Sequence, residues 1–342
     1  MEAFCSGVGT VAVEGPLVSL FAGGVRLSLR QGSGRVARST TFGKRTKAVW
    51  RDRAEARALS GIIYSKGFHM QNVSVSPAES TLGAPSGKWA LVTGASSGLG
   101  VEFAELLAAR KVNLVLTARR REPMERLALE LRRKHGVEIH VEPVDLSAPG
   151  AAGRLKENLD AKALRIDLLV NNAGFGLHGD FLDTPLSRTA EMIQLNVTAL
   201  TELSYVFGRD MASRGSGEML LVASLLAFQP VPTYAAYAAT KSYVLSFGEA
   251  LHDELRSRGV VVTTLCPGHT ETGFDAAADA RVSPMLRRLT MKPRPVAEAG
   301  LSALAEAKPS VIAGLLNKIV ALSNRFTTRS MQRASMRKVM AP

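Results

Sequence analysis

The chain has 342 residues, of which 46% are hydrophobic, enough to bury a core in one large domain or two smaller ones. Its formal net charge of +13 lies at the ends. Residues 1–88 hold 12 Lys/Arg against 5 Asp/Glu, residues 307–342 hold 7 against none, and residues 89–306 hold 24 against 25. A folded nucleic-acid-binding domain needs a basic face of its own, so we expect no nucleic acid partner.

Cysteine, histidine and hydropathy patterns exclude three further classes. The 2 cysteines are too few for a disulfide framework, and the 6 histidines show no metal-ligand spacing, so we expect no metal. The apolar stretch 219–240 is interrupted by Gln229, Pro230 and Pro232, whereas a membrane span needs about 20 continuous apolar residues. We therefore interpret it as a strand, a loop and a helix.

Residues 1–86 differ from the rest in composition. The first 25 residues contain no Lys or Arg, and basic, acid-poor sequence with Ser and Thr follows, which is typical of an organellar transit peptide, most like a plastid one. The alternatives are a disordered tail, or an upstream extension with Met70 as the true start. A plastid location is the expectation, with a cytoplasmic or membrane-peripheral location as the alternative.

From Lys88 onward, short apolar runs alternate with amphipathic helical segments. The runs are WALVTGA, VNLVLTA, VEIHVEPVD, IDLLVNNAG, EMLLVAS and VVVTTLCPG. Such alternation predicts a parallel sheet covered by helices on both faces. We expect one doubly wound α/β (Rossmann) domain over residues 87–312, with about seven strands and its ligand at their carboxyl ends.

The stretch TGASSGLG, residues 93–100, joins the first strand to the first helix. Its glycines let backbone approach a ligand closely, and the helix N-terminus offers free N–H groups to a pyrophosphate. The second strand ends in TARRRE, without the acidic residue that would bind the ribose of NAD, so Arg119 and Arg120 favour the 2′-phosphate of NADP. The cofactor residues expected in the turn are Gly94, Ser96, Ser97, Gly98, Leu99 and Gly100.

These motifs resemble those of the short-chain dehydrogenase/reductase family. The likeness rests on the TGxxxGxG spacing, on Asp145-Leu146 after the third strand and on NNAG at 171–174, and it runs from about residue 88 to 275. It implies that Asp145 and Leu146 contact the adenine, and that Asn172, Ala173 and Gly174 line the cofactor. The layout resembles a bacterial-type branch with a basic C-terminal extension. Family habit also implies a homo-oligomer, paired through the helices that hold Asn196 and Tyr237.

The stretch YAAYAATK, residues 234–241, holds the candidate proton donor for carbonyl reduction. Tyrosine is a poor acid at neutral pH unless a nearby cation lowers its pKa. Lys241 lies four residues after Tyr237, one helical turn away, whereas Tyr234 lies seven residues before Lys241. We therefore expect Tyr237 to be the acid and Tyr234 to pack or line the pocket.

The family resemblance completes a catalytic tetrad. Ser224, thirteen residues before Tyr237, matches the serine that hydrogen-bonds the substrate oxygen and the tyrosine. Asn196 matches the residue that holds a water linking Lys241 to solvent, and Lys241 also holds the nicotinamide ribose. Without this resemblance, Asn196 would be interpreted as a polar residue in mid-helix that bonds to backbone. The loop PGHTET implies that Pro267, Gly268 and Thr270 or Thr272 hold the carboxamide. His269 is expected to face solvent, and Cys266 to pack.

Substrate specificity is expected after the sixth strand, where the residue types are apolar. Phe274, Met285 and Leu286, with Phe175 and Leu177, favour a lipophilic ketone or a fatty-acyl chain. The primary hypothesis is an NADPH-dependent reductase of lipophilic carbonyls. The alternatives are a reductase of 3-oxoacyl groups on acyl carrier protein or coenzyme A, with Arg287, Arg288 or the tail contacting carrier phosphates, and a non-catalytic NADP-binding sensor or scaffold.

Residues 313–342 are expected to form a basic amphipathic helical tail. Leu315, Leu316, Ile319, Val320 and Leu322 precede a run of cations, Arg325, Arg329, Arg333, Arg337 and Lys338. Arginines four apart form one cationic stripe on a helix, as on a membrane-surface helix or a docking helix for an acidic carrier. An ordinary solvated basic helix remains the alternative.

Overall fold

The structure is a computed structural model of the chain that describes residues 18–21, 24–27, 87–274, 278 and 289–340. The chain divides into two units, Met1–Val73 and Ser74–Pro342. In the first, β1 (Val18–Phe21) pairs antiparallel with β2 (Gly24–Leu27), a hairpin that the sequence analysis did not foresee. The rest of 1–86, and with it most of the predicted transit peptide, lies outside the described residues.

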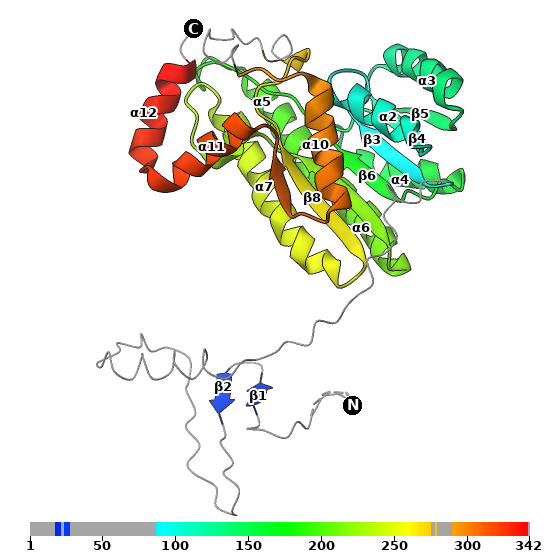
Figure 1. The fold of residues 1–342 in the computed structure, drawn as a ribbon, viewed down its shortest axis with the longest axis horizontal. Helices are drawn as coiled ribbons and strands as arrows, with labels where there is room; N and C mark the ends of the chain where they lie inside the picture. The colour runs from blue at the N-terminus through cyan, green and yellow to red at the C-terminus, as the bar shows by residue number, and fades with distance from the viewer. Residues whose placement is uncertain (1–17, 22–23, 28–86, 275–277, 279–288, 341–342) are drawn as a thin grey trace, which may run out of the picture. The chain divides into compact units, whose positions relative to one another are not determined.

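The second unit is built on a parallel sheet of seven strands in the order β5-β4-β3-β6-β7-β8-β9 (Figure 1). Its strands are β3 (Trp89–Thr93), β4 (Asn113–Ala118), β5 (Ile139–Pro143), β6 (Leu168–Asn171), β7 (Gly217–Val222), β8 (Val260–Cys266) and β9 (Ser310–Ile312). The chain builds outward from β3 to β5 and then returns to β6. The strand order therefore reverses between β3 and β6, the place where such folds bind ligands. The doubly wound prediction is confirmed.

Helices cover both faces of this sheet. They are α2 (Leu99–Ala109), α3 (Arg121–His135), α4 (Ala151–Ala161), α5 (Leu186–Ile193), α6 (Leu200–Arg214), α7 (Ala235–Arg256) and α10 (Pro293–Ala305). Ala90 and Val92 pack in one core cluster with α2, α3 and α10, while Leu91 packs in another with α4, α6 and α7. Because both faces of the sheet are buried, the strand sequences are continuous apolar runs and do not alternate between apolar and polar residues.

The helical stretch between β6 and β7 is interrupted at its centre. Between α5 and α6 the chain forms a π-helical segment, η1 (Gln194–Ala199), that contains the buried Asn196. Insertions of this kind occur often at functional sites, because the extra residue re-aims a side chain within the helix. After β7, a short 3₁₀ turn, η2 (Leu225–Phe228), connects Ser224 to the segment before α7.

The C-terminal segment folds as two helices joined by a turn. They are α11 (Leu315–Ser323), η3 (Asn324–Phe326) and α12 (Arg329–Met340). The cationic stripe expected on one helix is therefore divided, with Arg325 in η3 and the four-residue spacing of Arg329, Arg333 and Arg337 kept on α12. No helix in the described part of the chain is long and apolar enough to cross a membrane.

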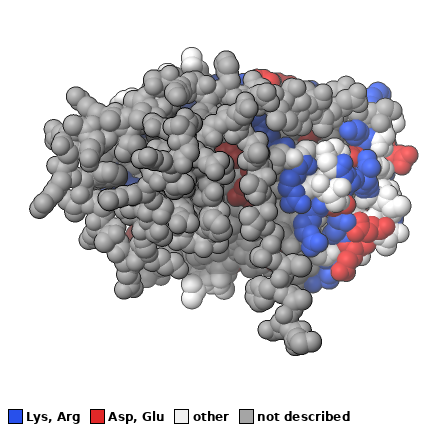
Figure 2. Space-filling view, turned by 90° about the horizontal axis from the view of Figure 1, so that it is seen from below, with Lys and Arg blue, Asp and Glu red and all other residues white. Residues whose placement is uncertain are grey.

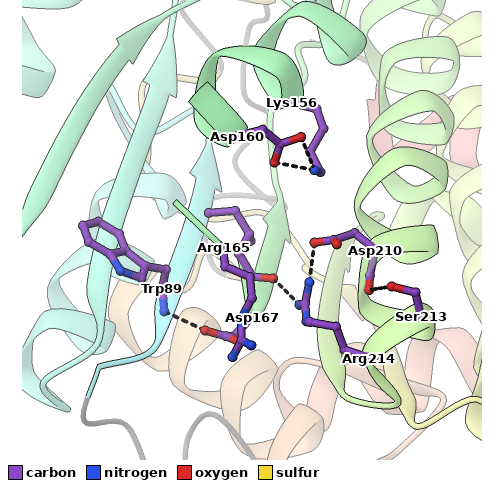
Figure 3. A network of polar contacts seen from close by, with 9 residues as sticks. Trp89, Lys156, Asp160, Arg165, Asp167, Asp210, Ser213 and Arg214 are labelled. Atoms are coloured by element: carbon purple, nitrogen blue, oxygen red, sulfur yellow. Dashed lines mark hydrogen bonds and ion pairs between the residues drawn. The ribbon is translucent and has the colours of Figure 1, made fainter. Parts of the chain in front are cut away.

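A polar network fixes the amino-terminal edge of the sheet, at the opposite end of the strands from the predicted site (Figure 3). The buried Asp167 carboxylate accepts the Trp89 backbone N–H at 3.1 Å and pairs with Arg165 at 3.2 Å. Arg214 donates to the Ile166 carbonyl at 2.8 Å and pairs with Asp210. These contacts join the starts of β3 and β6 to the end of α6.

The charged side chains of this unit are mixed in sign. Figure 2 shows basic and acidic groups interspersed over the described part of one face. Many are paired, as in Arg121–Glu125 and Lys156–Asp160. This distribution agrees with the near balance of charges counted over residues 89–306.

Candidate active site

The glycine-rich turn between β3 and α2 lies at the carboxyl edge of the sheet, where the strand order reverses. Gly94 has a φ of +67°, and a Cβ there would lie 2.8 Å from the Asn172 side chain. A Cβ on Gly100 would lie 2.2 Å from the Gly94 carbonyl oxygen. The helix begins after Gly98 without a side-chain cap. The first N–H groups of α2, through Leu99 and Gly100, are thus left for an anion.

Thr93 and Asn172 join the ends of the two central strands. The Thr93 hydroxyl accepts the backbone N–H groups of Asn172 and Ala173, both at 2.8 Å. The Asn172 side chain donates to the Thr93 carbonyl at 2.9 Å. This clamp holds the NNAG segment beside Gly94. No sequence pattern indicates this role of Thr93, because a hydroxyl that accepts two backbone N–H groups has no characteristic residue spacing.

The arginines predicted for a 2′-phosphate follow β4, next to the glycine-rich turn. Arg120 caps α3 and donates to the Ser96 hydroxyl at 3.4 Å, while Arg119 pairs with Glu191 at 3.0 Å. Hydrogen bonds from the Ser147 hydroxyl and backbone N–H hold the pKa of Asp145 below its ordinary value, and Arg119 adds to this effect. The Arg120 guanidinium therefore lies beside the glycine-rich turn, whereas the Arg119 guanidinium lies beside α5.

Asn196 is fully buried and joins the NNAG segment to α7. Its Nδ2 donates to the Phe175 carbonyl at 2.9 Å and to the Thr240 hydroxyl at 3.2 Å, and its Oδ1 accepts the Phe175 N–H at 3.1 Å. A Cβ on Gly174 would lie 2.8 Å from Asn196 Oδ1 and 3.5 Å from Lys241 Nζ. Asn196 therefore positions the backbone beside Lys241. Its water-holding role stays a prediction.

Ser224 and Tyr237 meet through their side chains. Ser224 follows β7 in extended conformation and accepts the Leu226 N–H at 3.1 Å, which fixes the hydroxyl. Burial raises the pKa of Tyr237 above its ordinary value, a hydrogen bond with Ser224 partly offsets this, and Tyr234 raises it further. The sequence analysis expected Lys241 to lower this pKa. In the structure burial outweighs any such effect, so the phenol is a neutral donor at physiological pH.

Lys241 is buried one turn after Tyr237 on α7. Its Nζ donates to the Val222 carbonyl at 2.8 Å and lies 5.9 Å from the centre of the Tyr237 ring. Burial lowers the pKa of Lys241 to about 8, and the Cys266 thiol partly opposes this. An ammonium has three N–H donors, so donors beyond the one given to Val222 remain for a cofactor ribose.

The Tyr237 ring lies in an apolar cluster. The Phe274 ring is 5.4 Å from it and the Tyr234 ring 6.1 Å, centre to centre. Tyr234 also packs on His178, with 4.9 Å between the ring centres, as expected of a residue that packs or lines the pocket. The cluster comprises Phe175, Met192, Tyr237, Leu177, Leu195, Leu226, Tyr234, Ala236 and Phe274. The predicted specificity residues Met285 and Leu286 and the arginines Arg287 and Arg288 lie outside the described residues.

The loop after β8 closes on the glycine-rich turn. A Cβ on Gly98 would lie 3.2 Å from Thr272 Cβ, and the Thr270 hydroxyl donates to the Gly268 carbonyl at 2.9 Å. The Pro267 carbonyl accepts the Leu225 N–H at 2.7 Å. His269, expected to face solvent, is instead half-buried, with Nδ1 2.7 Å from the Thr290 hydroxyl.

Cys266 is fully buried in β8, as expected of a packing residue, and burial raises its pKa to about 12. Within the described residues, no group of three or more His, Cys, Asp or Glu side chains could hold a metal ion.

The residues around the place where the strand order reverses, between β3 and β6, fit a nicotinamide dinucleotide. At Gly94, Gly98 and Gly100 a Cβ would come close to neighbouring protein atoms, and the N-terminus of α2 has no side-chain cap. Ser224, Tyr237 and Lys241 follow at the same edge of the sheet. The predicted tetrad and the predicted cofactor motifs thus lie together. The arrangement can bind an anion, orient a carbonyl oxygen and donate a proton to it.

Comparisons with known proteins agree with this geometry. The short chain dehydrogenase family model matches residues 88–282, more than half of the chain. The very-long-chain 3-oxoacyl-CoA reductase of Bos taurus is 32% identical over 198 residues, 57% of this chain and 63% of that protein. The 17-beta-hydroxysteroid dehydrogenase type 3 of Homo sapiens is 33% identical over 191 residues, 55% of this chain and 61% of that protein. Each match spans less than two thirds of the relative's length.

Among solved structures, a short-chain dehydrogenase from Sphingobium yanoikuyae in complex with NADPH superposes with a TM-score of 0.64. It is 30% identical, and the alignment covers 70% of this chain and 93% of that one. The ordered motifs, the seven-stranded sheet and these matches lead to one conclusion. The chain belongs to the short-chain dehydrogenase family.

Proposed function

We propose that the protein is an NADPH-dependent oxidoreductase that reduces a lipophilic ketone or aldehyde to an alcohol. The observation that carries this proposal is the Tyr237 hydroxyl, hydrogen-bonded to Ser224 inside an apolar cluster beside the dinucleotide motifs. A buried neutral phenol is suited to donate a proton to an oxygen that gains negative charge. An apolar surrounding favours a substrate with an apolar body.

The residues divide the chemistry among them. When bound, NADPH would supply a hydride from the nicotinamide C4. Ser224 would hydrogen-bond the carbonyl oxygen, and Tyr237 would donate the proton that converts the developing alkoxide to an alcohol. Lys241 would hold the nicotinamide ribose and restore the proton, with Asn196 fixing the backbone beside it. Oxidation of the alcohol is the same chemistry reversed, and reduction is favoured because NADPH pools are usually kept reduced.

The choice of NADPH over NADH rests on Arg119 and Arg120. Both follow β4 at the ribose end of the motif, and Arg120 reaches Ser96 in the glycine-rich turn. Guanidinium groups bind phosphate in bidentate fashion. Arg119 is paired with Glu191, so it would exchange that partner for a 2′-phosphate. The neighbour from Sphingobium yanoikuyae, solved with NADPH, supports the same choice.

A second candidate is reduction of 3-oxoacyl thioesters, because one relative is named a very-long-chain 3-oxoacyl-CoA reductase. The name of another, a 17-beta-hydroxysteroid dehydrogenase, favours a bulky lipophilic carbonyl instead. Both substrate classes are lipophilic, in agreement with the apolar cluster around Tyr237. The third reading, a non-catalytic NADP-binding sensor or scaffold, predicts a damaged tetrad. Here Asn196, Ser224, Tyr237 and Lys241 are all present and buried.

The test is turnover by the full chain with two tyrosine variants. We expect NADPH oxidation with lipophilic ketones or 3-oxoacyl-CoA, abolished in Tyr237→Phe and largely retained in the matched control Tyr234→Phe. NADPH binding should persist in both. Binding without turnover on any carbonyl would favour the sensor reading, and full turnover by Tyr237→Phe would refute the assignment of the acid. The ratio of kcat/KM for the two substrate classes decides between the enzyme readings.

A homo-oligomer remains part of the proposal. Tyr205 on α6 and Tyr243 on α7 are exposed, and Tyr243 stacks on Phe247 at 5.5 Å. Exposed aromatic side chains on these two helices support pairing between copies. Sedimentation of the wild type against Tyr205→Ser measures it, with a shift toward monomer expected in the variant.

A further inference from the structure

Helix α11 presents large apolar side chains to solvent. Leu315, Leu316, Ile319 and Leu322 are 53–74% exposed, and Phe326 in η3 is 81% exposed. Their spacing places them along one side of the helix. We call these five residues the α11 apolar face. Single exposed aliphatic residues are common, but a contiguous set on one helix marks a surface that contacts something apolar.

The orientation of this face is fixed by the opposite side of α11. Asn317 is 4% exposed and Ala321 is 6% exposed, so the helix buries a polar and a small residue instead of its leucines. Asn317 Nδ2 donates to the Ala313 carbonyl at 2.7 Å and lies 3.5 Å from the sulfur of Met291. It also packs so closely on Gly268 that a Cβ there would lie 2.2 Å from Nδ2. The outward face is therefore part of the folded structure.

Cations accompany the apolar face. The segment 307–342 contains no Asp or Glu. The exposed basic residues of α11, η3 and α12 are Lys318, Arg325, Arg329, Arg333, Arg337 and Lys338. None of these six pairs with an acidic side chain of the described residues within 4.0 Å, whereas many arginines of the catalytic domain do. The charge of this surface is thus available to an anionic partner.

We propose that the C-terminal helices α11 and α12 dock the protein on a membrane surface rich in acidic phospholipids. Leucine, isoleucine and phenylalanine side chains insert between lipids at the headgroup boundary, and neighbouring cations attract acidic headgroups. An acidic carrier protein would use the arginines but would leave the aliphatic side chains of α11 unexplained. Docking of this kind needs no spanning helix, and none of the described helices could span.

The docking surface adjoins the active site, a relation that rests on the proposed function. Met336 and Met340 of α12 pack in one cluster with Leu226 and Tyr234, which also border Tyr237. The Gln229 amide donates to the sulfur of Met336 at 3.4 Å and accepts a hydrogen bond from Asn324. Figure 1 shows α11 and α12 on the α7 side of the unit, far from α3. A lipophilic substrate dissolved in the membrane would thus meet the apolar cluster directly.

The experiment measures binding of the full chain to vesicles by flotation, without substrate or turnover. Vesicles of phosphatidylcholine alone are compared with vesicles that also contain phosphatidylserine. The first variant is the triple Leu315→Ser, Leu316→Ser, Ile319→Ser, and its matched control is Leu129→Ser, which alters an exposed leucine on α3. The second is the triple Arg329→Gln, Arg333→Gln, Arg337→Gln, controlled by Arg133→Gln, Arg256→Gln, Arg258→Gln. The basic N-terminal segment is the same in all of them.

We expect binding that requires the acidic lipid. The partition coefficient should fall about a hundredfold in both the serine triple and the α12 glutamine triple, with both controls near wild type. Unchanged binding in the serine triple would overturn the proposal. A homo-oligomer without lipid that dissociates in the serine triple would assign the face to contacts between copies instead. Turnover of a short water-soluble ketone, measured separately, tests the proposed function whatever the vesicles show.

Discussion

Replacing Asn196 by alanine tests whether this side chain is a structural clamp of the site. Its amide makes three hydrogen bonds to Phe175 and Thr240, at 2.9, 3.1 and 3.2 Å, and it is completely buried. Asn196→Ala leaves the N–H and the carbonyl of Phe175 without these partners. A buried polar group left unsatisfied costs about 1–3 kcal/mol, so the two groups together predict a loss of about 2–6 kcal/mol. That is a large part of the roughly 5–15 kcal/mol of a typical domain.

The assay is urea unfolding followed by tryptophan fluorescence, with kcat measured on the same preparations. The control is Ser204→Ala, which removes a different buried polar group, a hydroxyl, from the same helical stretch. Ser204 donates only to the Leu200 carbonyl of its own helix, at 2.8 Å, and this carbonyl also accepts from Asn171 at 3.0 Å. We expect the control to lose less than about 1 kcal/mol.

Activity should fall together with stability in Asn196→Ala. The Gly174 backbone lies against both Asn196 and Lys241, so a displaced Phe175 also displaces the surface proposed to hold the nicotinamide ribose. An Asn196→Ala protein that loses no more stability than Ser204→Ala would refute the clamp. If kcat still fell in that protein, the water-holding role implied by the family would explain the loss instead.

Three further predictions concern stability, pH and cofactor choice. Asp167→Ala should lower the free energy of unfolding by about 1–3 kcal/mol in urea with kcat unchanged, because it frees the Trp89 N–H at the edge remote from the site. Burial lowers the pKa of Lys241 to about 8 from 10.5, so the unfolded chain binds more protons between these pH values. Stability should therefore rise with pH across that window in the wild type but not in Lys241→Met, and kcat for reduction should fall above about pH 8. Arg119→Ala combined with Arg120→Ala should raise KM for NADPH about a hundredfold while KM for NADH changes little, with Arg133→Ala as control.

Each of these has an outcome that contradicts it. Equal unfolding curves for Asp167→Ala and the wild type would mean that the network of Figure 3 adds no net stability. A wild-type stability that is flat from pH 8 to 10.5 would mean that Lys241 is not desolvated as its burial implies. Parallel losses for NADPH and NADH in the arginine double variant would show that these residues support the fold of the turn and do not select the 2′-phosphate.

The parallel, doubly wound sheet was predictable because both of its faces are buried. Full burial requires continuous apolar runs, and such runs are visible without any tertiary information. The pairing of Tyr237 with Lys241 was also predictable, since it depends only on helical spacing within α7. The π-helical segment around Asn196 was not. It is stabilised by bonds to Phe175 and Thr240, residues 21 and 44 positions away, and no local pattern encodes them.

The electrostatics of Tyr237 show the same limit. Helical spacing indicates that a cation is near, and the sequence analysis inferred a lowered pKa from it. Phe274 comes from a loop 37 residues later, and with Phe175 it buries the ring. The sign of the shift therefore depends on long-range packing that outweighs a local neighbour. The proposed role of Tyr237 as proton donor does not depend on the direction of its pKa shift, because reduction needs the protonated phenol.

The orientation of α11 depends on a few contacts that the amphipathic pattern does not contain. Leu315, Leu316 and Ile319 have the spacing of a core-facing helix, so the pattern alone would turn them inward. Gly314 begins the helix with a φ of +86°, at a place where a Cβ would lie 2.8 Å from the sulfur of Met291. This tight turn after β9 sets the rotation of α11 about its own axis, so that Asn317, and not a leucine, packs against Gly268. A side chain at position 314 would therefore disturb the loop after β8 and the outward face together. Because the turn at Gly314 couples these two features, the α11 apolar face points outward even though its side chains are then exposed to water.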